Sequence, residues 1–396
     1  MSYPKLKLKK NEDRRILAGH LWVFSNEVDT KSTPLNKFEP GEIVTVTSQN
    51  DRPLANAYIN PHSLISARVF SHSVKQALDN KLITARISQA LSLRQECFAE
   101  PYYRMIYSEG DLLPGVIVDR YNDTLVLQVS TLGMEVHQDD IVQALKEVVQ
   151  PATIILNNNT SARKQEGMET YSKVIEGDAP DTIQIDENNA RFHVPAMGGQ
   201  KTGWFYDHRA NRQAMQTWVK EKQVLDVFSY AGGWGIQAAL AGASQVHCIE
   251  TSETACELIL ANAELNGVNE KLSIGTADAF EALAALKQEG KKFDVIILDP
   301  PAFIKRKKDL KQGTIAYQRL NKLAMQLLPV NGILISASCS FHLSREQHLK
   351  ILRTSAQQTG YQLQIVEQGG LGPDHPIHPA IAETAYLSCF TVRLLR

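Results

Sequence analysis

Short apolar runs alternate with longer stretches of helical spacing over the second half of the chain. The apolar runs are expected to form strands at residues 224–228, 246–249, 272–274, 295–298 and 333–336. The stretches between them, such as 252–265 and 315–328, repeat apolar residues at helical intervals. This alternation predicts right-handed crossovers and a parallel sheet with helices on both faces. Ligands of such sheets bind at the carboxyl ends of the strands.

The start of the chain follows shorter patterns that are typical of strands. Apolar and polar residues alternate at 5–9, and apolar runs at 42–47 and 66–70 lie between Pro, Gly and Asn turns. Trp22 and Phe24 belong to this β-rich part. They either fill the core of a small barrel or form a stacking surface for RNA bases.

Helices and strands are mixed in the next part of the chain. Helical spacing at 76–100 and 138–149 predicts two helices. Strands are expected at 102–107, 116–118, 125–129 and 154–156, with the middle two as a hairpin. The polar stretch 157–167 is expected to be a surface loop. These changes of pattern predict three domains: a small β-barrel at 1–72, a small α+β domain at 73–185, and an α/β domain at 186–396.

Composition narrows the class of protein. With 43% hydrophobic and 21% charged residues among 396, the chain has the make-up of a soluble globular protein, and no apolar run is long enough to span a bilayer. The basic start lacks the apolar core of a secretory signal, so a cytoplasmic location is expected. Five cysteines are scattered without a CxxC pair, which argues against disulfides and against a metal site. Because the net charge is −1, a polyanion would have to be met by local basic patches.

Residues that carry chemistry collect at the expected carboxyl ends of the strands. The first strand runs into the glycine-rich turn DVFSYAGGWG at 226–235, which suits a nucleotide-like cofactor, since side chains at the glycines would keep it from the backbone. The candidate cofactor residues of this turn are Asp226, Phe228, Ser229, Tyr230, Gly232 and Gly233. Glu250, after the second strand, can accept both hydroxyls of a ribose, and Asp278, after the third, can accept an adenine amine. An acid at a strand end is, however, often only the N-cap of the next helix.

Two classes of cofactor fit this turn. The glycine spacing and Glu250 also satisfy a loose dinucleotide fingerprint, so an NAD-dependent dehydrogenase is an alternative. The segment DPPAF at 299–303 follows the fourth strand directly. Its carboxylate, Asp299, and its rigid prolines, Pro300 and Pro301, would form a shelf for a flat base, and hydride transfer has no need of one. A Pro-Pro turn that simply ends a strand is the plainer interpretation.

Together these motifs resemble those of class I S-adenosylmethionine-dependent methyltransferases. Over its full length, from GHLWVFSNEV through EGDLLPGVIVDRY, RKQEGMET, GGQKTGWFYDHR and DVFSYAGGWG to LDPPAF and SASCS, the chain is similar to the bacterial 23S ribosomal RNA cytosine-5 methyltransferase I family. The resemblance implies an N-terminal PUA RNA-binding domain, a central α+β domain and a C-terminal Rossmann-like catalytic domain. It also implies S-adenosyl-L-methionine as cofactor and 23S ribosomal RNA as partner. Whether the RNA is naked or in an assembly intermediate stays open, and so does the oligomeric state, for which a homodimer is one candidate.

Methylation at carbon 5 of cytosine requires a nucleophile, because this carbon reacts only after a thiolate has added to carbon 6. Cys339 lies just beyond the fifth strand, between Ser338 and Ser340, and in the strand order of these enzymes it is expected beside Asp299. A buried core thiol is the plainer alternative. Asp299 would hydrogen-bond the exocyclic amine or a protonated ring nitrogen, and Phe303 would stack on the base.

Further candidates come from the resemblance and from charge. In the family, the segment 200–209 contributes to the pocket, although it could be a surface loop. Its candidate cofactor residues are Lys201, Thr202, Asp207 and Arg209. Ala302 stands where many RNA cytosine-5 enzymes carry a second cysteine. Lys305 and Arg306 follow the shelf, where RNA phosphates would run, although a run of charge is usually a solvated face.

Two alternatives to cytosine-5 methylation stay open. Asp299 and the two prolines would also hold an exocyclic amine of an RNA base for methylation, in which case Cys339 is incidental. A non-catalytic RNA-binding or ribosome-assembly factor would bind the cofactor without turnover.

Overall fold

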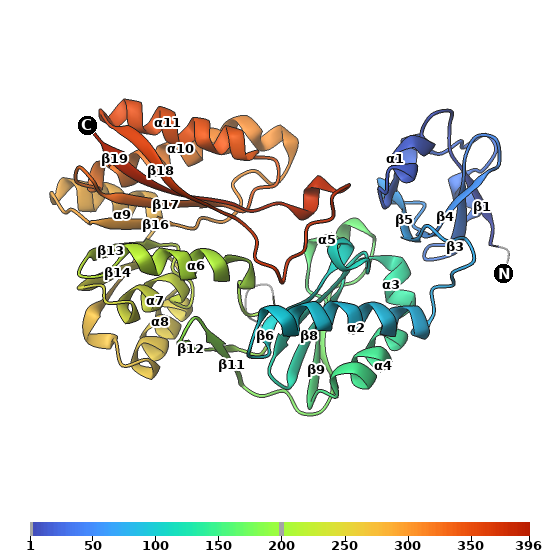
Figure 1. Ribbon diagram of the computed structural model, residues 1–396, viewed down its shortest axis with the longest axis horizontal. Coiled ribbons are helices and arrows are strands. Elements are labelled where there is room, and N and C mark those ends of the chain that lie inside the picture. The colour runs from blue at the N-terminus through green and yellow to red at the C-terminus, as the bar shows by residue number, and fades with distance from the viewer. Residues whose placement is uncertain (1–2, 198–201) are drawn as a thin grey trace. The chain divides into compact units, whose positions relative to one another are not determined.

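The computed structural model describes residues 3–197 and 202–396, which fall into two compact units (Figure 1). The first unit consists of Met1–Ile183, Pro195–Trp204 and Pro373–Thr384, and the second of Gln184–Val194, Phe205–Gly372 and Ala385–Arg396. Near its end, the chain therefore leaves the second unit and adds a short segment to the first.

The first unit begins with a five-stranded sheet in the order β1-β3-β4-β5-β2. The elements are β1 (Lys5–Lys7), α1 (Asp13–Leu17), β2 (Trp22–Phe24), β3 (Ile43–Thr47), β4 (Pro53–Ile59) and β5 (Ile65–Ser71). β1 pairs parallel with β3, and the other pairs are antiparallel. Alternate residues such as Leu6, Val23 and Val46 are buried in one core. Trp22 packs against this core while half-buried, and its Nε1 donates to Glu109 Oε1 at 2.8 Å.

A second five-stranded sheet follows in the order β10-β9-β8-β7-β6. Its strands are β6 (Tyr102–Tyr107), β7 (Val116–Tyr121), β8 (Thr124–Val129), β9 (Thr153–Asn157) and β10 (Ser172–Glu176), and its helices are α2 (Asn80–Cys97), α3 (Leu132–Val136), α4 (Gln138–Val149) and α5 (Ser161–Gln165). β7 and β8 form the predicted hairpin. The expectation of a surface loop at 157–167 is wrong, because α5 lies within it and Arg163 is 1% exposed where it pairs with Glu135.

The second unit contains a seven-stranded sheet in the order β15-β14-β13-β16-β17-β19-β18. Its strands are β13 (Gln223–Val227), β14 (Gln245–Glu250), β15 (Leu272–Thr276), β16 (Val295–Leu298), β17 (Ile333–Ser338), β18 (Gln362–Gly369) and β19 (Ser388–Leu395). The five predicted strands are parallel, as expected. β19 runs antiparallel to both of its neighbours, and it and β18 lie outside the runs that predict strands. A separate two-stranded sheet is made by β11 (Thr182–Glu187) and β12 (Ala190–Pro195).

Helices cover both faces of the seven-stranded sheet (Figure 1). They are α6 (Arg209–Met215), α7 (Gly233–Leu240), α8 (Glu253–Leu265), α9 (Ala279–Gln288), α10 (Leu310–Leu327) and α11 (Arg345–Thr359). In Figure 1, α10 and α11 lie on one face, and α6 and α7 on the other. Because both faces are covered, the central strand β16 is buried at every residue, which accounts for its unbroken apolar run. In the part of the chain that the structure describes, no helix is long and apolar enough to cross a membrane.

Candidate active site

The turn between β13 and α7 is sharply bent. Phe228, Tyr230 and Gly232 have φ angles of 68°, 50° and 83°, in the left-handed region that costs a non-glycine residue about 1 kcal/mol or more. The amides of Phe228 and Ser229 both donate to the carbonyl of Ile249, at 3.0 and 3.2 Å. The neighbouring strand β14 therefore holds the turn in this conformation at the carboxyl edge of the sheet.

Asp226 lies fully buried at the end of β13 and organises the helix that follows. Its Oδ2 accepts a hydrogen bond from the amide of Gly235 at 3.0 Å. Gly235 is required for packing, because a Cβ there would lie 2.7 Å from Cys248 Sγ. Burial raises the pKa of Asp226 to about 7, and the charges of Asp299 and Glu250 add to the increase.

The next two strand-end acids are held by backbone amides. Glu250 accepts hydrogen bonds from the amides of Tyr230, Thr251 and Ser252 at 2.9, 2.8 and 3.1 Å. Asp278 is exposed and caps α9, with its Oδ1 accepting from the first-turn amides at 2.9 and 3.2 Å. The N-cap interpretation of Asp278 is therefore confirmed, and the adenine contact stays a prediction.

Asp299 follows β16 and is fixed on both carboxylate oxygens. His208 Nε2 lies 3.1 Å from Oδ1, and Trp234 Nε1 donates to Oδ2 at 2.9 Å. Burial by itself would raise the pKa of Asp299, but the His208 ring and the two N–H donors outweigh it, so the pKa is lowered. Asp299 is thus held as an ionised acceptor.

Cys339 lies one residue past β17, the sheet neighbour of β16. Its side chain is half-buried, and Sγ lies 3.8 Å from the carbonyl oxygen of Pro300. The Tyr317 hydroxyl makes 2.9 Å hydrogen bonds with the hydroxyls of Ser338 and Ser340, which fixes the residues on either side of the thiol. The thiol thus lies beside the carbonyl of Pro300, in the DPPAF segment, and is not buried in the core; its contact with Asp299 and its role as nucleophile stay predictions.

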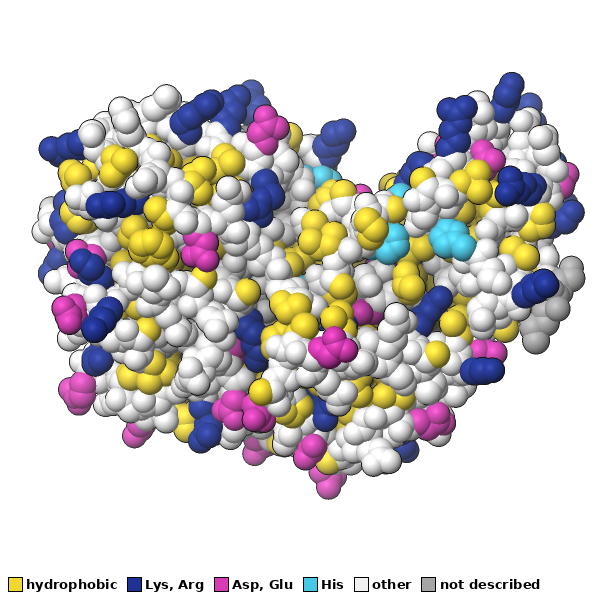
Figure 2. All heavy atoms as spheres, in the orientation of Figure 1, with side chains coloured by type: hydrophobic (Ala, Val, Ile, Leu, Met, Phe, Trp, Pro, Cys, Tyr) yellow, Lys and Arg dark blue, Asp and Glu magenta, His cyan; other side chains and the backbone are white. Residues whose placement is uncertain are grey.

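The rest of the DPPAF region combines buried and exposed groups. Pro300 is buried and Pro301 is exposed. The Phe303 ring packs against Tyr317, with ring centroids 4.8 Å apart. Lys305 and Arg306 are exposed. Figure 2 shows that Lys and Arg side chains on the visible face are interspersed with acidic ones, as the near-neutral net charge suggests.

The candidates from segment 200–209 are distributed differently. Lys201 lies outside the described residues. Thr202 belongs to the first unit, where its buried hydroxyl donates to Asp119. Asp207 and Arg209 belong to the second unit; Asp207 accepts a 2.5 Å hydrogen bond from the Tyr386 hydroxyl. Arg209 Nε lies 3.7 Å from Glu187 Oε2.

Three residues of the site are absent from the sequence predictions, namely His208, Trp234 and Tyr317. Trp234 and His208 lie within motifs that the sequence singles out, DVFSYAGGWG and GGQKTGWFYDHR, so the motifs locate them without indicating their partners. Tyr317 is one of several apolar-face residues of α10 and carries no distinguishing signal.

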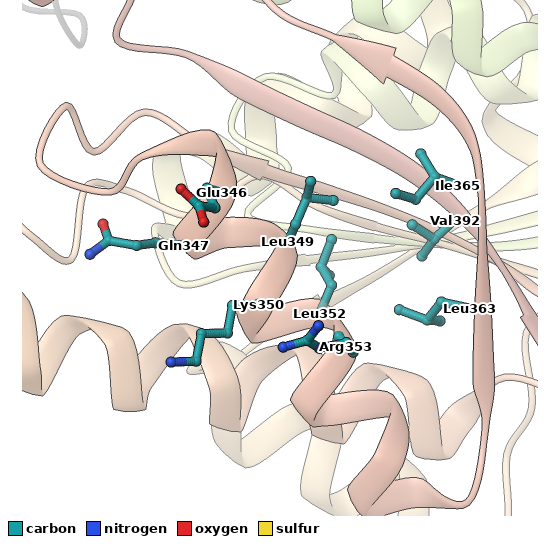
Figure 3. A pocket seen from close by; sticks show the side chains of 9 residues that line it. All are labelled: Glu346, Gln347, Leu349, Lys350, Leu352, Arg353, Leu363, Ile365 and Val392. Carbon is teal, nitrogen blue, oxygen red and sulfur yellow. The ribbon is translucent and has the colours of Figure 1, made fainter.

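A cavity of about 530 Å³ lies elsewhere in the second unit, between α11 and the strands β18 and β19 (Figure 3). Apolar side chains line it, with Lys350 and Arg353 on the helix side. It shares no residue with the strand-end cluster, which carries all the chemistry described above.

Two family sequence profiles match the chain. A profile for a PUA-like domain matches residues 6–72, and one for an S-adenosylmethionine-dependent methyltransferase matches residues 127–387.

Relatives and solved structures agree with these profiles. A protein of Tolumonas auensis named ribosomal RNA large subunit methyltransferase I is 35% identical over 395 residues and covers 98% of each chain. A protein of Cronobacter sakazakii with the same name is 34% identical over 396 residues, covering 99% of each. A Streptococcus mutans structure, provisionally named a SAM-dependent methyltransferase, has a TM-score of 0.84 at 21% identity, over 98% of this chain and 100% of that one. A second structure, a provisionally named methyltransferase complexed with SAH, has a TM-score of 0.86 at 21% identity with the same coverage. At that identity the structures show a shared fold.

Proposed function

The chain belongs to the S-adenosylmethionine-dependent methyltransferases of the ribosomal RNA large subunit methyltransferase I family, and we propose that it forms 5-methylcytosine in 23S ribosomal RNA through a covalent adduct with Cys339. Family membership leaves the dehydrogenase alternative without support. The observation that carries the proposal is the position of the Cys339 thiol, 3.8 Å from the Pro300 carbonyl and at the strand end next to that of Asp299.

The strand-end residues suit S-adenosylmethionine, which supplies an electrophilic methyl group when bound. Glu250 presents a carboxylate already oriented by three amides, and we assign it to the ribose hydroxyls. The amides of Gly233 and Trp234, the first two of α7, suit the methionine carboxylate, whereas the amide of Gly235 already donates to Asp226. We assign Asp278 to the adenine amine.

The chemistry assigned to this chain begins at Cys339. Its thiolate adds to carbon 6 of cytosine, so an S–C bond forms and the C5–C6 double bond opens. Asp299 accepts a hydrogen bond from the exocyclic amine or from a protonated ring nitrogen. This bond holds the base, and it favours protonation of the ring nitrogen, which balances the negative charge that the thiolate adds to the ring. With the cofactor bound, carbon 5 would then take its methyl group as the bond from that methyl to the sulfonium sulfur breaks, and the leaving group would be S-adenosylhomocysteine. A base, to which no residue of this chain is assigned, takes the carbon 5 proton; the electron pair restores the C5–C6 double bond as the S–C bond breaks, and Cys339 leaves as the thiolate.

RNA recognition is assigned to the PUA-like domain and to the basic residues that follow DPPAF. The PUA-like domain at 6–72 supports RNA binding, and the exposed Lys305 and Arg306 would contact phosphates beside the base. We retain the three-domain division at 1–72, 73–185 and 186–396, a cytoplasmic location, and naked RNA or an assembly intermediate as substrate.

Mass-spectrometric mapping of cytosines in 23S ribosomal RNA, from cells with and without the gene, tests the proposal. We expect one 5-methylcytosine to disappear with the gene and to return with the wild-type gene but not with Cys339→Ala. Cys97→Ala is the matched control, because Cys97 is exposed in the first unit. Retained methylation in Cys339→Ala would favour transfer to an exocyclic amine instead. Binding of labelled cofactor without incorporation into unmodified RNA would favour a non-catalytic factor.

A further inference from the structure

Behind Asp299 lies a chain of hydrogen bonds that the proposed chemistry does not use. The amide of Gly370 donates to Asn211 Oδ1 at 3.0 Å, and Asn211 Nδ2 donates back to the carbonyl of Gly370 at 3.0 Å. The same Nδ2 lies 3.3 Å from His208 Nδ1, and His208 Nε2 lies 3.1 Å from Asp299 Oδ1. All four residues belong to the second unit.

The backbone of Gly370 determines which groups donate and which accept along this chain of hydrogen bonds. Since the amide of Gly370 must face an oxygen, the carboxamide of Asn211 is oriented with its NH₂ group towards His208. In a neutral ring, a donor opposite Nδ1 makes that nitrogen the acceptor, so the proton is on Nε2, where it is donated to Asp299.

The surroundings leave this arrangement little freedom. His208 and Asn211 are 2% and 6% exposed. A Cβ on Gly369 would lie 2.0 Å from Asn211 Oδ1, so the approach of β18 to Asn211 requires glycine. The second oxygen of Asp299 is held by Trp234, whose ring centroid lies 5.4 Å from that of His208.

We propose that His208, oriented by Asn211, is a positioning residue for the methyl transfer, which holds Asp299 as a fixed, acceptor-only carboxylate towards the target base. The effect of His208 on kcat rests on the proposed function. The tautomer of His208 and its hydrogen bonds do not depend on that function. A carboxylate free to rotate would present its oxygens to the base amine in only a fraction of encounters. Orientation is therefore the contribution of His208, and the contact with the base belongs to Asp299.

The structural part is tested by ¹⁵N NMR of the histidine rings in the full-length protein. We expect His208 to show the Nε2–H tautomer in the wild type and to lose this preference in Asn211→Ala. An Nδ1–H tautomer in the wild type, or a spectrum unchanged by Asn211→Ala, would overturn the inference. This measurement requires no methyl transfer, so it gives an answer even if cytosine is not the substrate.

The kinetic part is tested with His208→Phe and His208→Gln. We expect His208→Phe to lower kcat about a hundredfold with KM for S-adenosylmethionine nearly unchanged, because the group lost only orients another. His208→Gln keeps an N–H donor and should recover most of the rate. His247→Phe is the matched control for the loss of an imidazole, since His247 bonds to Ser273 on the neighbouring strand.

A double-mutant cycle separates positioning from folding. If His208 acts through Asp299, adding His208→Phe to Asp299→Asn should cause little further loss of kcat. Additive losses, or failure of His208→Gln to exceed His208→Phe, would overturn the positioning role. An inactive wild type would overturn the proposed function, leaving the NMR result to decide on the tautomer.

Discussion

The two compact units hold their buried and half-buried carboxylates in different ways. In the first unit, each of three carboxylates accepts two hydrogen bonds from one arginine guanidinium. The pairs are Asp111 with Arg94, Asp119 with Arg104, and Glu135 with Arg163. In the second unit, Asp226, Glu250 and Asp299 lie at strand ends and accept from N–H groups of the backbone or of a ring. Among the described residues, no lysine or arginine forms an ion pair with these three.

We propose that this difference separates carboxylates with a structural role from carboxylates that bind a ligand. An arginine fork neutralises a carboxylate and uses its lone pairs within the fold. A carboxylate held by N–H groups keeps part of its accepting capacity for a ligand. The contrast is not one of location, because Glu187 of the second unit pairs with Arg212 at 2.6 Å in the structural manner.

Removing an arginine from the first unit should have the largest effect. Arg104→Met would leave Asp119 buried without its cationic partner and should lower the free energy of unfolding by about 3–5 kcal/mol. Urea denaturation measures the change. The control, Arg191→Met, breaks an exposed pair with Asp186 and should cost at most about 1 kcal/mol. Equal losses in the two variants would contradict the structural role.

Removing the charge from Asp299 should instead affect rate. Asp299→Asn keeps the shape of the side chain, and we expect kcat/KM for RNA methylation to fall about 10²–10³-fold, equivalent to about 2.7–4 kcal/mol, with little change in the urea midpoint. Steady-state kinetics on ribosomal RNA measures the loss. Asp186→Asn, which removes a surface carboxylate of the same unit, serves as the control. A large loss of stability without a loss of rate would place Asp299 with the structural carboxylates.

The sequence indicates the strand-end acids well and their partners poorly. The apolar runs place Asp226 and Asp299 at the ends of adjacent parallel strands, because a strand buried on both faces is continuous in its hydrophobicity. β18 is an edge strand of mostly polar residues, QLQIVEQG, none of which is buried, so no apolar run predicts it. The tautomer of His208 depends on that strand, because Gly370 follows it directly.

The other contacts that the sequence does not predict join residues that lie far apart in the chain. His208 and Asp299 are 91 positions apart, and no local pattern couples them. Likewise, Asp374 bonds to the backbone amide of Arg104, at a separation of 270 positions, which helps to hold the segment Pro373–Thr384 in the first unit. Such pairs follow from tertiary packing, which periodicity does not encode.

The raised pKa of Asp226 makes the stability of the folded protein depend on pH. From its ordinary value of 3.8 the pKa rises to about 7 in the folded protein, first through burial and then through the charges of Asp299 and Glu250. Between these values the folded state binds more protons than the unfolded state. The contribution of this proton uptake to the free energy of unfolding is therefore complete below about pH 4, and it is lost as the pH rises through about 7.

Asp226→Asn should remove this dependence. The difference in unfolding free energy between wild type and variant should change by about 1 kcal/mol per pH unit between about pH 5 and pH 7, with the wild type losing stability as the pH rises. Urea midpoints measured at half-unit steps give the slope. Parallel profiles for the two proteins would mean that Asp226 is ionised throughout this range.

Substitution of Asp278 should have the smallest effect. Its carboxylate caps α9 and is also assigned to the adenine amine of the cofactor. Its Oδ1 caps α9, so Asp278→Ala should lower the free energy of unfolding by about 1 kcal/mol. Asp278→Asn retains a capping oxygen and should keep this stability, but it removes the charge that would face the adenine amine. If Asp278 binds the cofactor, calorimetry should show a few-fold weaker affinity for S-adenosylmethionine in both variants. If affinity falls only in Asp278→Ala, the loss follows the cap, and Asp278 belongs with the structural carboxylates although it lies at a strand end.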